Sequence, residues 1–386
     1  MLNYTLPQLL KTLVAQNASD LHISVDTPPR LRVHGHLVPL DLPPLAPEDS
    51  KHLCYSVLTE EQKKGFETHK ELDLAFSVKG VARFRANIFT QKGNISGAFR
   101  LIPFQIKALT DLGFPATLYD LCELPRGLVL VTGPTGSGKS TTLAAMIDYI
   151  NEKRRDHIVT IEDPIEFVHT HKNCSIDQRE LGSDTVSFAR ALKSVLRQDP
   201  DVVLIGEMRD LETISLAITT AETGHLVFGT LHTNSCVSSI TRLVDVFPSH
   251  QQPQVRTQLS FTLMGVLSQL LNPKIGGGRV CSYELMAPNT AIRAAIRDDK
   301  LHLIYSMMQT GQDVSGMITM NQSLARLVEK GVIDREMAES KSPDVDELHN
   351  ILEKRSMSAM AQQNKIMGRA AGFGNGAPGP GKGGKR

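Results

Sequence analysis

The sequence contains no apolar run close to the roughly 18 residues that a membrane-spanning helix needs. Its first residues, Met1-Leu2-Asn3-Tyr4-Thr5, have neither the basic start nor the long apolar core of a secretion signal. The five cysteines are scattered and form no CxxC pair, which argues against a disulfide framework or a zinc site. Together these absences predict a cytoplasmic protein with reduced thiols.

The chain also lacks a strong excess of either charge, since its formal net charge is +1. The basic side chains gather at the C-terminus: from Glu353 onward there are seven Lys or Arg residues and one acid, so the body before them is mildly acidic. An acidic body is not typical of a dedicated nucleic-acid binder. The contents of 41% hydrophobic and 22% charged residues are those of a soluble globular protein.

The 386 residues predict two domains and a tail. We expect a small α+β domain over residues 1–102 and a linker at 103–115, where proline and glycine recur. An α/β domain with helices at its C-terminal end follows over 116–355. Residues 356–386, mostly Gly, Ala, Pro, Lys and Arg, are expected to form a disordered basic tail.

Hydrophobic periodicity predicts the elements of the first domain. They are a helix over 6–16, strands at 21–25 and 31–34, a helix over 48–64, a β-hairpin of 72–78 and 82–89, and a strand at 95–101.

From about residue 116, apolar strands alternate with helices, which is typical of a parallel α/β sheet. The expected strands are 128–131, 158–161, 202–205 and 226–230, with helices over 187–197 and 211–222 between them. Beyond Pro248 we expect helices over 251–271, 290–298, 301–310 and 320–330, and one short strand near 280–285.

A GxxxxGK[ST] motif lies between the strand 128–131 and a helix, which is the context of a P-loop. Its glycines let backbone N–H groups approach phosphate oxygens, and the new helix directs its positive end at the same anion. The lysine would reach the β- and γ-phosphates, and the serine hydroxyl would bind Mg²⁺. The residues expected to bind ATP here are Gly133, Pro134, Thr135, Gly136, Ser137, Gly138, Lys139, Ser140 and Thr141.

A second acidic strand end is needed to hold Mg²⁺ with Ser140. The run Asp201-Val202-Val203-Leu204-Ile205-Gly206-Glu207 is an apolar strand that ends in an acid. Ligands of open α/β sheets bind at the carboxyl ends of the strands, so Glu207 is the predicted Mg²⁺ ligand. Alone, the run would be read only as a buried strand.

The run Thr160-Ile161-Glu162-Asp163-Pro164-Ile165-Glu166 ends another strand with three carboxylates. Pro164 stops the strand and fixes where Glu162 and Asp163 point. Glu162 is the predicted residue that orients or deprotonates the attacking water, and Asp163 is expected at the nucleotide. The alternative for each acid is a structural salt bridge.

Two histidines bracket the strand 226–230. Buried histidines are usually hydrogen-bonded members of a core. Because this strand belongs to the predicted nucleotide sheet, either His225 or His232 would serve as a γ-phosphate sensor, and His232 is favoured as it follows the strand's carboxyl end.

The P-loop, the Thr160–Glu166 run, Gly206-Glu207 and Gly224–His232 resemble, in order, the Walker A, Asp box, Walker B and His box of the secretion-superfamily ATPases. The resemblance starts at Ser19-Asp20-Leu21-His22-Ile23 and extends to about residue 350. It implies a PAS-like N-terminal domain, a RecA-like domain, a ring of six subunits and nucleotide held between the two domains.

Within this superfamily the chain is most similar to the pilus-retraction motors. It carries Ala291-Ile292-Arg293-Ala294-Ala295-Ile296-Arg297-Asp298, where retraction motors have the helix AIRNLIRE. The resemblance also assigns Arg85 and Arg100, which read alone as surface arginines, to the nucleotide phosphates, and Arg197 as a weaker candidate for a contact from a neighbouring subunit.

The implied partners are an inner-membrane pilus platform protein and, further, an extension or accessory retraction ATPase, with the chain peripheral to the membrane. Three alternatives stay open. They are an accessory retraction, secretion or DNA-uptake ATPase of the same superfamily, a RecA-like nucleic-acid translocase, and a regulatory nucleotide-binding protein.

Overall fold

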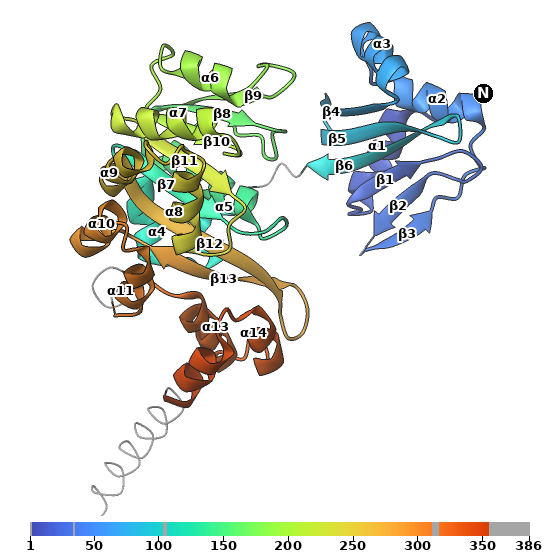
Figure 1. The fold of residues 1–386 in the computed structure, drawn as a ribbon. Helices are drawn as coiled ribbons and strands as arrows, with labels where there is room; N and C mark the ends of the chain where they lie inside the picture. The colour runs from blue at the N-terminus through green and yellow to red at the C-terminus, as the bar shows by residue number, and fades with distance from the viewer. Residues whose placement is uncertain (1, 34, 103–105, 311–315, 355–386) are drawn as a thin grey trace, which may run out of the picture. The chain divides into compact units, whose positions relative to one another are not determined.

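The computed structural model describes residues 2–33, 35–102, 106–310 and 316–354 (Figure 1). The predicted tail at 356–386 and part of the predicted linker lie outside these residues. The chain divides into two compact units. The first comprises Met1–Phe114, Leu118–Leu128 and Ser140–Thr230, and the second Pro115–Thr117, Val129–Lys139 and the chain from Leu231 on. Among the described residues, no helix has the length and apolar character needed to cross a membrane.

A six-stranded antiparallel sheet, drawn in blue in Figure 1, is formed by the N-terminal residues in the order β3-β2-β1-β6-β5-β4. Its hydrophobic core includes Leu21, Phe84 and Phe99, together with the apolar side of helix α1. The helix predicted over 6–16, the β-hairpin of 72–78 and 82–89, and the strands predicted at 21–25, 31–34 and 95–101 are all confirmed. The strands are β1 (Asp20–Ile23), β2 (Arg30–Val33), β3 (His36–Pro39), β4 (Glu71–Val78), β5 (Ala82–Gln91) and β6 (Asn94–Ile102), and the first helix is α1 (Leu6–Ala15).

The single helix predicted over 48–64 is wrong. The structure has two helices there, α2 (Pro47–Tyr55) and α3 (Glu60–His69). The break has a local cause, because Thr59 caps the second helix: its hydroxyl accepts from the Gln62 N–H, and the Gln62 side chain accepts from the Thr59 N–H at 3.0 Å. Such a reciprocal capping box fixes the start of a new helix, here α3.

The second sheet has seven strands in the order β13-β12-β7-β11-β10-β8-β9. Pairing is parallel from β9 through β8 and β10 to β11. All four predicted parallel strands are confirmed, as β7 (Gly127–Thr132), β8 (His157–Glu162), β10 (Val202–Ile205) and β11 (Leu226–Leu231). The polar strand β9 (Ser175–Glu180) and the strand β12 (Leu263–Pro273) were not predicted.

The helix predicted over 251–271 is correct only in its first half. Helix α9 (Gln252–Thr262) ends there, and Leu263 begins β12, which pairs antiparallel with β13 (Arg279–Met286). The leucine-rich composition of this segment favours a helix, but its residues from Leu263 to Gln269 are nearly all buried, and the ladder with β13 satisfies their backbone. Tertiary burial therefore overrides the local helix propensity.

Helices follow both sheets. Those after residue 106 are α4 (Ala116–Cys122), α5 (Lys139–Lys153), α6 (Phe188–Val195), α7 (Leu211–Glu222), α8 (Cys236–Asp245), α9, α10 (Thr290–Arg297), α11 (Ile304–Thr310), α13 (Met320–Glu329) and α14 (Arg335–Lys341), with short 3-10 turns at Leu109–Leu112 and Leu301–Leu303.

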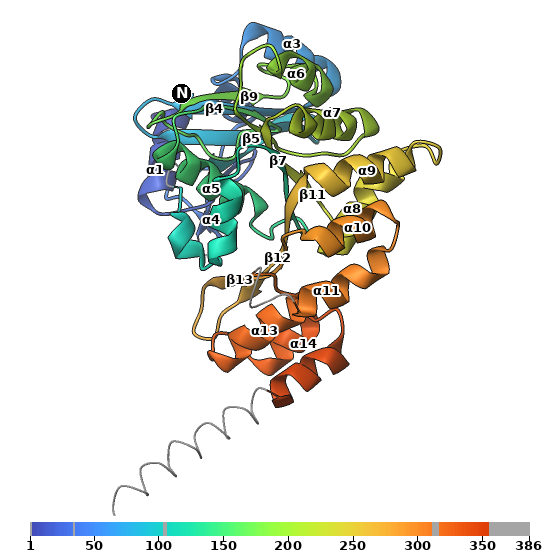
Figure 2. The ribbon, with the colours of Figure 1, turned by 90° about the vertical axis from the view of Figure 1, so that its left-hand side faces the viewer.

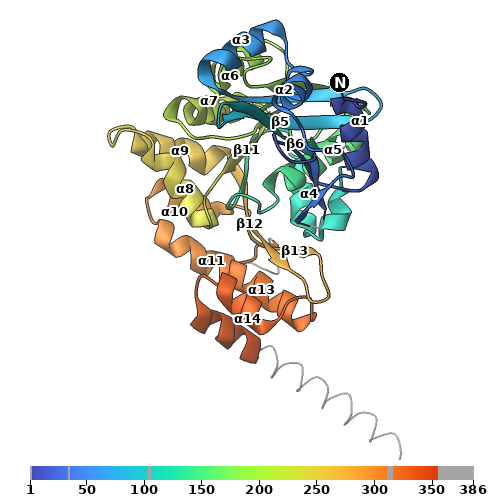
Figure 3. The same cartoon turned by 90° about the vertical axis from the view of Figure 1, so that its right-hand side faces the viewer.

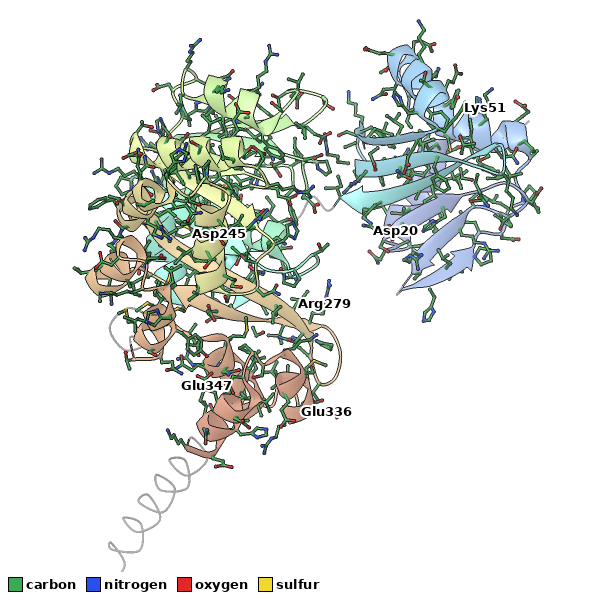
Figure 4. The ribbon with its side chains drawn as sticks, viewed as in Figure 1. Asp20, Lys51, Asp245, Arg279, Glu336 and Glu347 are labelled. Carbon is green, nitrogen blue, oxygen red and sulfur yellow. The ribbon has the colours of Figure 1, made fainter. Side chains whose placement is uncertain are left out.

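The C-terminal helices pack near the β12–β13 hairpin within the second unit (Figure 2). Glu347, labelled in Figure 4, ties them together, since its carboxylate accepts from the Tyr305 hydroxyl and the Asn321 amide, each at 2.6 Å. This mixed α/β architecture confirms the predicted fold class at that level.

Candidate functional site

The P-loop forms where the sequence predicted it. Strand β7 is buried throughout and ends at Thr132, and α5 begins at Lys139. Between them, Gly136 has φ +79° and Gly138 has φ +94°, backbone angles that side-chain-bearing residues rarely adopt. The Lys139 ammonium donates to the carbonyl oxygens of Gly133, at 2.8 Å, and Pro134, at 3.1 Å. The lysine thus lies folded over the loop, where an anion would be held.

Glu162, the last residue of β8, is held by three hydrogen bonds. Residues two apart in a strand share a face, and the Thr160 hydroxyl donates to Glu162 Oε1 at 2.6 Å. Gln178 of β9 is paired with Thr160 across the parallel ladder, and its amide donates to the same oxygen at 3.2 Å. The Glu166 N–H donates weakly to Oε2 at 3.4 Å.

Burial of the Glu162 carboxylate raises its pKa, because a charged group loses hydration there. The hydrogen bonds from Thr160, Gln178 and the Glu166 backbone stabilise the ionised form and oppose that rise, while the nearby Glu166 charge adds to it. The net pKa remains above the ordinary glutamate value. A carboxylate whose pKa is raised towards neutral pH, in a fixed position, is suited to take a proton.

Gln178 also organises the loop after Glu162. Its amide donates to the Phe167 carbonyl at 2.8 Å, and its own carbonyl accepts from the His169 N–H at 2.8 Å. Sequence reasoning missed Gln178 because β9 is a polar strand with little hydrophobic alternation. Thr160 belongs to the acidic run, but the sequence alone assigns it no functional role.

Glu207 lies directly beyond β10, close to the end of β8. The Gly206 N–H donates to the Ile161 carbonyl at 2.8 Å, and a Cβ on Gly206 would lie 3.1 Å from the Glu162 Cα. A side chain at 206 would therefore push the two acidic strand ends apart. The Arg209 guanidinium forms an ion pair with Glu207. The ends of β8 and β10 that carry Glu162 and Glu207 thus lie side by side.

The described residues contain no cluster of three or more His, Cys, Asp or Glu side chains able to hold a metal. Mg²⁺ bound with a nucleotide needs no such cluster, since it usually takes one or two protein oxygens plus phosphates and waters. The Glu207 carboxylate and the Ser140 hydroxyl are hard oxygen donors of that kind.

Arg85 and Arg100 lie directly opposite each other on β5 and β6. Both are exposed. The Arg100 guanidinium donates to Asp20 Oδ1 at 2.8 Å, whereas Arg85 approaches its diagonal neighbour Asp73 only to 3.9 Å. The two like charges thus face each other across the ladder, and each has a carboxylate beside it. Asp20 is labelled in Figure 4.

Each of the remaining candidate residues lies at the end of a strand or a helix. His232 is exposed just beyond β11, Asp163 is exposed just beyond β8, and Arg197 is exposed after α6. His225 lies at the amino end of β11, where its ring contacts the Thr220 carbonyl at 3.0 Å and the Thr223 hydroxyl at 3.2 Å. These contacts join His225 to the end of α7, and its assignment to the nucleotide stays a prediction.

Helix α10 contains the motif that resembles the retraction helix, and it lies beside α9 (Figure 3). Ile292 and Ile296 are fully buried, and the Arg293 guanidinium donates to the carbonyls of Ser260 and Phe261, at 2.8 and 3.2 Å. The cation thus satisfies backbone oxygens at the end of α9. The two isoleucines and the first arginine therefore have structural roles within the chain.

A family model described as "Type II/IV secretion system protein" matches residues 2–364. The chain belongs to this family. Among its relatives, the type IV pilus retractation ATPase PilT of Pseudomonas aeruginosa is 52% identical over 335 residues, which cover 87% of this chain and 97% of PilT. The type IV pilus ATPase PilU of the same organism is 38% identical over 352 residues, covering 91% and 92%.

The fold agrees with that family membership. A crystal structure of the pilus retraction motor PilT with bound ADP superimposes with a TM-score of 0.86 at 51% identity, covering 90% of this chain and all of that one. The resemblance to the secretion-superfamily ATPases, drawn from four short blocks and the retraction helix, is therefore confirmed.

Proposed function

We propose that this chain is a motor ATPase that hydrolyses ATP to power type IV pilus retraction, and with it twitching motility. The observation that carries the proposal is the 52% identity to PilT across nearly all of both chains. The identity to the type IV pilus ATPase PilU is lower, at 38%, so another pilus ATPase of the same superfamily, such as an accessory retraction ATPase, is the second choice.

The P-loop would bind the phosphates of ATP. Lys139 would leave the carbonyls of Gly133 and Pro134 for the β- and γ-phosphates. Ser140 and Glu207 would hold Mg²⁺, which neutralises charge developing on the phosphates, and Glu207 would exchange Arg209 for the metal. Thr141 and Asp163 complete the proposed contacts to nucleotide, whereas His225, proposed from the sequence, lies at the amino end of β11, the opposite end of that strand from the P-loop edge of the sheet.

Glu162 would orient the attacking water and accept its proton. Its fixed position and raised pKa support this role. His232 would sense the γ-phosphate, and Arg85 and Arg100 would stabilise charge on the phosphates in the transition state.

The finer architecture is part of the same proposal. Residues 1–102 would form a PAS-like domain and residues 116–355 a RecA-like domain, joined through 103–115 and followed by the tail at 356–386. Six copies would form a ring at the cytoplasmic side of the inner membrane, turning a pilus platform protein as the domains close over ATP and reopen.

The deciding experiment compares wild-type protein with Glu162→Gln. We expect magnesium-dependent ATP hydrolysis by the wild type, a fall of about 10²–10³-fold in kcat for the variant, and retained ADP binding. In cells, a deletion complemented by the variant should keep surface pili and lose twitching motility. Bald cells would refute retraction, stimulation by single-stranded DNA would indicate a translocase, and ATP binding without hydrolysis would indicate a regulatory protein.

A further inference from the structure

Gln269, in strand β12, contacts the P-loop from within the second unit. Its side-chain amide donates to the Ser137 carbonyl at 2.9 Å. Its backbone carbonyl approaches the start of the loop so closely that a Cβ on Gly133 would lie 2.3 Å from it, and a Cβ on Gly138 would lie 3.2 Å from the amide nitrogen. Strand β12 therefore lies close against the loop at Gly133, Ser137 and Gly138.

The amide is costly where it lies. Gln269 is 1% exposed, and its Oε1 has no hydrogen-bond partner within the described part of the chain; the same holds for the neighbouring Ser137 hydroxyl. A buried polar atom without a partner destabilises the folded state. An apolar side chain of similar size would avoid the unpartnered Oε1, but it would also remove the donor to the Ser137 carbonyl.

The geometry of the peptide bond suggests what the amide does. In a trans peptide the carbonyl of one residue and the N–H of the next point in opposite directions. Holding the Ser137 carbonyl towards β12 therefore turns the Gly138 N–H away from β12. N–H groups at this place in a P-loop are the ones that cradle phosphate.

We propose that Gln269 is a positioning residue that fixes the Ser137–Gly138 peptide of the P-loop in its phosphate-binding orientation. The inference rests on the proposed function only as far as nucleotide binding at this loop. It assigns Gln269 no contact with nucleotide.

The test uses full-length protein and two variants of one strand. Gln269→Met keeps the size of the side chain and removes its hydrogen bond. The matched control is Asn272→Leu, because Asn272 is also fully buried in β12, donates one bond to the Ser282 hydroxyl at 2.9 Å and has an unpartnered carbonyl oxygen. That bond ties β12 to β13 and does not involve the loop.

For Gln269→Met we expect roughly tenfold weaker ADP binding, about 1.4 kcal/mol, and a similar rise in KM for ATP with kcat changed by less than about threefold. Asn272→Leu should shift the midpoint of thermal unfolding measured in the absence of ADP. It should leave the Kd of the folded protein for ADP unchanged. If Gln269→Met does not fold, Gln269→Leu replaces it, since its smaller apolar side chain likewise cannot donate to the Ser137 carbonyl.

Wild-type ADP affinity in the folded Gln269 variant would overturn the inference, as would an equal loss in Asn272→Leu. The outcome is separable from the proposed function. If the wild-type protein binds ADP without hydrolysing ATP, and Gln269→Met weakens that binding, the motor ATPase is refuted and this inference stands.

Discussion

Glu162 and the arginine pair are proposed for the same reaction, but the protein holds them in opposite ways. The Glu162 carboxylate is enclosed by β8 and β9 and accepts from three donors. The Arg100 side chain is 70% exposed; among the described residues it has one carboxylate partner, and Arg85 has only a distant one.

The Glu162 carboxylate is thus held in position before nucleotide binds, whereas the Arg85 and Arg100 side chains are held only loosely until it binds. A half-buried carboxylate held by hydrogen bonds needs little reorganisation during reaction. Two facing arginines repel until an anion lies between or above them, so their attraction for phosphate should be strongest when charge on it is greatest. This contrast can be tested from both sides.

The largest effect is expected at the arginines. Arg85→Ala and Arg100→Ala should each lower kcat about 10³-fold, because arginines that stabilise phosphoryl transfer contribute at least that much. ADP binding should fall by less than about tenfold. Steady-state ATPase assays and ADP titrations measure the two quantities.

Arg32→Ala is the control, since Arg32 lies on β2 of the same sheet with its Nε 3.7 Å from Asp20. Its turnover should match the wild type. If both test variants hydrolyse ATP at the wild-type rate, the pair is ordinary surface charge and the contrast with Glu162 fails.

Much of this contrast was predictable from the sequence. Alternation located β5 and β6, so Arg85 and Arg100 were expected on neighbouring strands. The apolar runs ending in Glu162 and Gly206-Glu207 predicted strands of a parallel sheet with acids at their carboxyl ends. In both cases the signal is local: a period of two, or a buried run followed by acids.

The residues that hold these groups were not predictable in the same way. Gln178 lies on a polar strand whose identity depends on pairing with β8, and Gln269 lies on a leucine-rich strand that local propensity favours as helix. Their partners, Glu162 and Ser137, are far away in sequence. Such contacts follow from tertiary pairing, which hydrophobic periodicity does not encode.

A second test sharpens the account of Glu162 through pH. If Glu162 accepts the proton, kcat should rise with pH through its raised pKa. Thr160→Val and Gln178→Leu each remove a bond that favours the ionised form, so the pKa should rise further and the acid limb should move up by about one pH unit. At a pH on that limb, kcat should fall about tenfold, with little change above it.

Thr230→Val is the matched control for the pH profile. Thr230 is a buried threonine of β11 whose hydroxyl donates to the Gly206 carbonyl and makes no bond to Glu162. Its variant should leave the midpoint of the acid limb in place. An unmoved limb in both Thr160→Val and Gln178→Leu would mean that another group titrates there.

The smallest effect concerns how Arg100 is held. Burial opposes ionisation of Asp20, but hydrogen bonds from Ser19 and Arg100 and the nearby Arg100 and His22 charges outweigh it and lower the Asp20 pKa. A lowered pKa in the folded state stabilises the protein above the unfolded-state pKa, near 3.9, and that contribution is lost as the pH falls through the folded value. Asp20→Asn should therefore lower the free energy of unfolding by about 1 kcal/mol at pH 7, a modest amount because Arg100 is exposed.

Urea unfolding of wild type and Asp20→Asn from pH 7 to pH 3 measures this difference, which should shrink below about pH 4. Asp73→Asn is the comparison, since the Asp73 carboxylate is 61% exposed and 3.9 Å from Arg85, and it should change stability little at any pH. Equal losses for the two variants would show that Arg85 and Arg100 are held alike. A loss for Asp20→Asn alone would show that the sheet restrains one arginine and leaves the other to be ordered by its anion.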